Sequence, residues 1–140
     1  LKNEIIPPLN NYWNLKINLF DPCVEKYQKF PNENIDISIC IDVLEHIPEE
    51  DHDWILEKFL TITNCFSFIQ VACYPAIALL PNGKNAHISI KDHNYWYDKL
   101  IKITQTSPNI KIICLCVYKD DKGQFPFHEI GINDKLENYL

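Results

Sequence analysis

The sequence predicts an α/β domain built on an open, mostly parallel sheet. Apolar, β-branched runs at 35–41 and 65–73 indicate two strands, and the segment 48–63 between them repeats its apolar residues at helical spacing. A strand, a helix and a strand within about 40 residues form a βαβ unit, in which the strands are parallel and the crossover is right-handed. The 140 residues suit a single domain with one core.

Two further elements flank this unit. The segment 15–20 alternates apolar and polar residues and ends at Asp21 and Pro22, which predicts a short strand and a turn. The segment 93–105 places apolar residues on one face, and Asp92 precedes it as a candidate N-cap, so we expect a second helix there.

The C-terminal part predicts an antiparallel hairpin. The segments 110–118 and 125–132 read as strands on either side of a DDKG turn. That connection is too short for a crossover, which takes about a dozen residues or more, so the two strands run in opposite directions. His128 and Glu129 then lie within the reversed strand, where we expect them to be structural rather than catalytic.

Composition excludes several classes of function. With 46% hydrophobic residues, 23% charged residues and no apolar run of about 20 residues, the chain is typical of a globular protein without a membrane span. Its net charge of −6 and its lack of any basic run argue against a nucleic-acid partner. No CxxC pair occurs, so we expect free, buried cysteines and a cytoplasmic protein. The cysteines expected to be buried are Cys40, Cys65, Cys73, Cys114 and Cys116.

Polar side chains follow the predicted strands where ligands bind in open α/β sheets, at the carboxyl ends. They are Asp21, Asp42 and Tyr74, and the loop after Tyr74 brings His87. Three of them have a structural alternative that the sequence leaves open. Asp21 could form a turn, Asp42 could form a capping box with Glu45, and His87 could be a satisfied structural histidine.

The stretch IDISICIDVLEHIPEED at 35–51 resembles the strand-four region of class I S-adenosylmethionine-dependent methyltransferases. The later order of elements is similar, and residues 83–91 resemble that family's G-x-x-x-H-x-x-x-P loop. The resemblance covers about residues 15–132 and implies a Rossmann-like methyltransferase sheet. It also implies that this family's last strand inserts, so that 125–132 would lie between 65–73 and 110–118.

The resemblance implies a set of site residues for methyl transfer from S-adenosylmethionine to a small-molecule or metabolite-like acceptor. The expected cofactor contacts are Asp21 for the ribose hydroxyls and Asp42, Val43 and Leu44 for the methionine side. His87 is the candidate base, with Tyr74 and Trp96 as walls of the acceptor pocket. No metal ligand is expected.

The sequence departs from this family at its beginning. It has no glycine-rich loop after a first strand, no counterpart of the acid that contacts adenine, and no Met at all. We therefore expect a partial methyltransferase domain over 1–140 that lacks the first strand, and we expect this chain alone to bind the cofactor poorly.

Two other classes of function remain. One is a noncatalytic binding or scaffold domain with the methyltransferase fold. The other is a metal-dependent hydrolase using Glu45, His46, His87 and Asp92. Adjacent residues on an α-helix point to different sides, which argues against Glu45 and His46 sharing an ion.

Overall fold

The computed structural model describes residues 14–105 and 108–133, in two compact units that divide after Glu33. The first unit contains a 3-10 turn, η1, at Glu25–Tyr27. The strand predicted at 15–20 is wrong, because these residues have no regular secondary structure. A strand needs a neighbour to accept its backbone hydrogen bonds, and the described part of this unit contains no strand for it to pair with.

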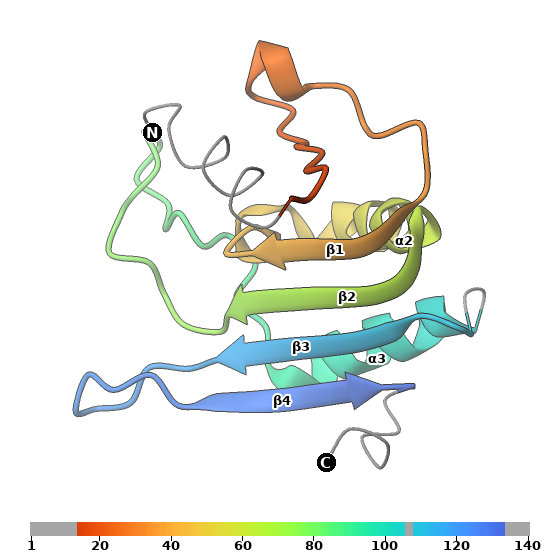
Figure 1. Ribbon diagram of the computed structural model, residues 1–140. Helices are drawn as coiled ribbons and strands as arrows, with labels where there is room; N and C mark the ends of the chain where they lie inside the picture. The colour runs from red at the N-terminus through yellow and green to blue at the C-terminus, as the bar shows by residue number, and fades with distance from the viewer. Residues whose placement is uncertain (1–13, 106–107, 134–140) are drawn as a thin grey trace. The chain divides into compact units, whose positions relative to one another are not determined.

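The second unit is an α/β fold on a four-stranded open sheet (Figure 1). Its spatial order is β1-β2-β3-β4, with β1 and β2 parallel, β2 and β3 parallel, and β3 and β4 antiparallel. The mostly parallel sheet and the C-terminal hairpin are therefore confirmed. The strands are β1 (Ile35–Ile41), β2 (Thr63–Ala72), β3 (Lys111–Val117) and β4 (Phe127–Ile132).

The predicted position of the last strand is wrong. β3 pairs directly with β2, with Ile69 opposite Cys114, and β4 lies outside β3 with Ile130 opposite Cys114. The hairpin closes tightly, since the Tyr118 amide donates to the Pro126 carbonyl at 2.8 Å. The edge of β2 is occupied by β3, so the returning strand adds to the free edge of β3. The topological support expected for the methyltransferase arrangement is absent.

Two helices connect the parallel strands and pack on the same face of the sheet (Figure 1). Helix α2 (His52–Thr61) follows two 3-10 turns, η2 (Leu44–His46) and η3 (Glu49–Asp51). Helix α3 (His93–Thr104) begins as predicted, with the Asp92 carboxylate accepting a hydrogen bond from the Tyr95 amide at 2.9 Å. Within the described ranges, no helix is both long enough and apolar enough to cross a membrane.

The core lies between these helices and the sheet. Trp96, Leu56 and Leu60 are fully buried and meet the inward side chains of β2 and β3. Cys114 and Cys116 are buried as expected, whereas Cys65 is exposed. Cys65 is two residues from the buried Ser67, but the pairing register of β1 and β2 shifts between Thr63 and Phe66, and this irregularity interrupts the alternation of faces at Cys65.

The opposite face of β1 is apolar and exposed. Ile37, Ile39 and Ile41 are 57%, 63% and 46% exposed, while the intervening Ser38 is buried toward the helices. The second unit therefore covers only one face of a sheet whose parallel strands are apolar on both, a pattern usually found in sheets with two covered faces.

Candidate functional site

The candidate site lies at the carboxyl ends of β1 and β2, which adjoin because the two strands are parallel. Ile41 pairs with Gln70, so the residues that leave each strand, Asp42 and Cys73, emerge at the same edge. The chain after β1 turns at once into η2, and the chain after β2 enters the loop 73–92 that leads to α3. This edge is where the sequence placed the site.

Asp42 makes the turn out of β1. Its φ of +51° is in the left-handed region, which Asp tolerates better than most residues. The Asp42 amide donates to the Gln70 carbonyl at 3.2 Å, and its carboxylate accepts from the Gln70 side-chain amide at 3.1 Å. η2 begins after Val43 without a side-chain cap, so the capping-box alternative for Asp42 and Glu45 is wrong.

The next two residues have opposite environments. Val43 is 44% exposed at the rim, whereas Leu44 is 2% exposed and belongs to the core. Of the two, only Val43 offers a surface to a ligand. Leu44 anchors the turn beneath it.

Glu45 is a fully buried acid at this edge. Its Oε1 accepts a hydrogen bond from the Ala72 amide at 3.2 Å, and its Oε2 has no hydrogen-bond partner among the described residues. Burial raises the pKa of the Glu45 carboxyl above its ordinary value, an effect that backbone hydrogen bonds oppose. A buried polar atom without a partner is uncommon and points to an unusual role.

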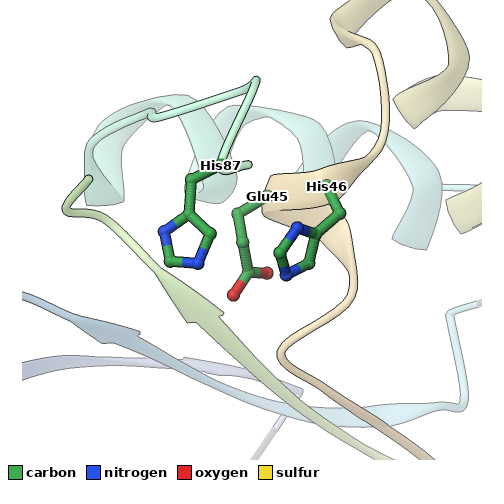
Figure 2. A group of neighbouring side chains, drawn as sticks. All are labelled: Glu45, His46 and His87. Atoms are coloured by element: carbon green, nitrogen blue, oxygen red, sulfur yellow. The ribbon is translucent and has the colours of Figure 1, made fainter. Parts of the chain in front are cut away.

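Two imidazole rings flank this carboxylate. Figure 2 shows the side chains of Glu45, His46 and His87 directed toward one another, with one donor atom of each within 4.8 Å of the others. His46 is exposed and His87 half-buried, and their ring centroids are 4.9 Å apart. The expectation that Glu45 and His46 point apart is wrong, because this segment is a short 3-10 turn and not an α-helix.

Backbone carbonyls orient both rings. Nδ1 of His46 is 2.9 Å from the Ala86 carbonyl oxygen, and Nδ1 of His87 is 2.6 Å from the Tyr74 carbonyl oxygen. A carbonyl can only accept, so each Nδ1 carries the proton and donates it. In the neutral ring, Nε2 is then left with a free lone pair.

The loop 73–92 is tied down across η2. The Ser89 amide donates to the Glu45 carbonyl at 3.0 Å, and the Ser89 hydroxyl donates to the Ile47 carbonyl at 2.6 Å. Within the loop, the Asn85 side chain accepts from the amides of Ala76 and His87, each at 2.9 Å. His87 is therefore held between the Asn85 side chain and the Tyr74 carbonyl and does not sit on a free loop.

His52 supports the same turn from below. Its Nε2 lies 3.0 Å from the Leu44 carbonyl oxygen and 3.1 Å from that of Ile47, so it donates to both, and Nδ1 accepts from the Tyr95 hydroxyl at 2.9 Å. The ring is fully buried, and this burial lowers the pKa of His52. A neutral histidine therefore fixes the path of residues 44–47.

The other predicted site residues have varied positions. Tyr74 is half-buried with its ring centroid 5.7 Å from that of His87, so these two meet as expected. Trp96 is instead fully buried in the core, and Asp92 caps α3. Asp21 accepts from the Cys23 amide at 2.9 Å, as a turn former does. Asp21 belongs to the first unit, so its shared cleft with Asp42 stays a prediction.

A shallow, open depression lies beside the cluster, and His87 forms part of its wall. The residues that line it are Leu80, Asn82, Lys84, Asn85, His87 and Ile88. All of these residues come from the loop between β2 and α3. Small molecules would reach the imidazole from this side.

Compared with models of known protein families, with curated proteins and with solved structures, the chain shows no match. The fold and the site therefore define only a class: an α/β protein with an open sheet and a Glu-His-His cluster at the carboxyl edge.

Proposed function

We propose that this edge of the sheet performs S-adenosylmethionine-dependent methyl transfer to a small-molecule acceptor. The observation that carries the proposal is the turn Asp42–His46, which leaves a parallel strand at its carboxyl end and presents an exposed carboxylate beside an exposed Val43. That combination suits a cofactor with hydroxyl groups, a cationic sulfonium and an apolar methyl group. The order of β3 and β4 lends the proposal no support.

The chemistry requires alignment more than acid–base power. The acceptor atom attacks the methyl carbon in line, the carbon–sulfur bond breaks, and its electron pair stays on sulfur as the thioether. An acceptor that loses a proton on methylation needs a base within hydrogen-bond reach. His87 fits this role, because its Nδ1–H is committed to Tyr74 and its Nε2 lone pair is free.

The acidic surroundings favour the cofactor's charge. The chain has a net charge of −6, and both Asp42 and Glu45 belong to the turn. A sulfonium is stabilised by nearby carboxylates, as any cation is.

Backbone amide spectra of the 15N-labelled chain, titrated with S-adenosylhomocysteine, test the proposal. We expect weak binding, because the chain has no glycine-rich loop, with shifts concentrated at Asp42, Val43 and Tyr74. Asp42→Ala should abolish these shifts, whereas Asp36→Ala, which removes a carboxylate from the same strand nearer its amino end, should retain them. If the amide shifts of residues 42–44 do not change, or if both variants show equal shifts, methyl transfer at this edge is refuted and a noncatalytic domain is favoured.

A further inference from the structure

The Glu45, His46 and His87 side chains form a donor set that the proposed methyl transfer does not fully use. They are two imidazoles and one carboxylate, with a donor atom of each within 4.8 Å of the other two (Figure 2). Methyl transfer needs at most one base from this group. The convergence of all three from two separate segments requires its own explanation.

The two rings are arranged as metal-binding histidines are. A histidine that binds a metal through one ring nitrogen almost always donates its other N–H to a carbonyl, a carboxylate or water. His46 and His87 each donate Nδ1–H to a backbone carbonyl, at 2.9 and 2.6 Å. The Nε2 lone pair of each ring therefore remains available to a metal ion.

The carboxylate supplies an independent observation. Glu45 is fully buried, and its Oε2 has no hydrogen-bond partner in the described part of the chain. A buried charge without compensation is costly, and a bound cation is a standard way to compensate it. The unpartnered oxygen belongs to the same carboxylate that lies between the two rings in Figure 2.

We propose that Glu45, His46 and His87 bind a divalent transition-metal ion of the Zn²⁺ type. Two imidazoles and a carboxylate are the protein ligands of several catalytic zinc sites and of the facial triad of non-haem iron enzymes. Ca²⁺ and Mg²⁺ prefer ligand sets made only of oxygen atoms, whereas two of the three ligands in this cluster are imidazole nitrogens. Three protein ligands also leave positions open for water or a substrate.

Binding requires a small inward movement of the donors. Metal–ligand bonds of about 2.0–2.2 Å place neighbouring ligands roughly 3–3.5 Å apart. The donor atoms of the three side chains now lie within 4.8 Å of one another, so these distances have to shorten by about 1 Å. Side-chain rotation can supply a movement of this size. His46, the exposed member, has the most freedom to close on the ion.

The ion would change how the site works. A metal bound at Nε2 of His87 occupies the lone pair that would otherwise serve as a base, so the two uses exclude each other at that nitrogen. With the ion bound, polarisation of a coordinated oxygen atom would replace proton acceptance. Metal binding does not depend on the proposed methyl transfer, and it is tested without the methyl donor.

The test titrates the chelator-treated chain, without a histidine tag, with Zn²⁺ by calorimetry and with Co²⁺ by visible absorption. We expect one ion per chain and a Co²⁺ spectrum of nitrogen and oxygen ligands. His46→Ala and Glu45→Gln should each weaken Zn²⁺ binding at least about tenfold. His128→Ala is the matched control, because it removes an exposed histidine outside the cluster and should leave the affinity unchanged.

Thermal unfolding of each variant verifies the fold. His46→Ala alters an exposed side chain and Glu45→Gln preserves its shape, so neither should unfold the chain. Binding that is equally strong in the wild type and in His46→Ala would overturn the proposal. A thiolate-to-cobalt charge-transfer band that persists in both variants would also overturn it, since it would assign the ion to the free cysteines.

Discussion

His52 is expected to hold the functional turn in place, and its removal should therefore be costly. Its ring is fully buried, packs 4.8 Å from the Trp96 ring centroid, and donates to the carbonyls of Leu44 and Ile47. The perturbation is His52→Ala. Other contacts hold the surrounding helix and turn in place, so they do not collapse into the space that the ring leaves. A cavity therefore remains.

The magnitude follows from which partners remain. The Leu44 carbonyl still accepts from the Ile47 amide at 3.1 Å, and the Ile47 carbonyl still accepts from the Ser89 hydroxyl. Neither carbonyl is therefore orphaned, and the cavity dominates. Replacing a large buried side chain by Ala costs about 2–5 kcal/mol, and the ring of His is smaller than that of Phe, so we expect about 3 kcal/mol.

Urea denaturation followed by tryptophan fluorescence measures this loss, since Trp96 packs against the ring. His52→Gln is the matched variant. Its amide can donate to one of the two carbonyls, which should recover about 1 kcal/mol relative to Ala. A loss below about 1 kcal/mol for His52→Ala would refute the burial of the ring. Equal stability of the Ala and Gln variants would refute its hydrogen bonds to the two carbonyls.

Burial also determines how stability depends on pH and how much substitutions on α3 cost. The lowered pKa of His52 means that its stabilising contribution is complete above its ordinary pKa of 6.5 and is lost as the pH falls through 6.5 toward the lowered folded value. Urea midpoints from pH 8 down to pH 5 should show this decline, and a decline of the same size in His52→Gln would contradict it. Leu100→Ala should cost about 2–5 kcal/mol, while Ile101→Ala should cost less than about 1 kcal/mol, because these neighbours on α3 are 1% and 37% exposed. Similar losses in urea melts would show that α3 is rotated.

The sequence predicted those parts of the fold that depend on local patterns. The strand at 35–41 and the helix that begins after Asp92 have the apolar spacing and the cap that define such elements, and both are present. The strand at 15–20 has the same kind of alternation but no described strand in its unit to pair with. The order of β3 and β4 depends on which of them pairs with the edge of β2. Local sequence patterns do not determine that pairing.

The site was predicted by position more than by chemistry. The rule that ligands bind at the carboxyl ends of parallel strands selected Tyr74 and His87, and the structure places their rings beside each other. As metal ligands, Glu45 and His46 belonged only to the hydrolase alternative, and helical geometry argued against their sharing an ion. The left-handed φ of Asp42 and the 3-10 turn after it change that geometry. The sequence of residues 44–46 alone indicates neither feature.

The base and the metal site both depend on imidazole nitrogens with free lone pairs beside the buried Glu45 carboxylate. Long-range ¹H–¹⁵N spectra of the histidine rings, recorded on the metal-free chain above neutral pH, report directly which nitrogen of each ring is protonated. We expect His46 and His87 both to carry the proton on Nδ1 and to leave Nε2 unprotonated, since each Nδ1 faces a carbonyl oxygen. Protonation on Nε2 in either ring would contradict the arrangement on which both the base and the metal site depend.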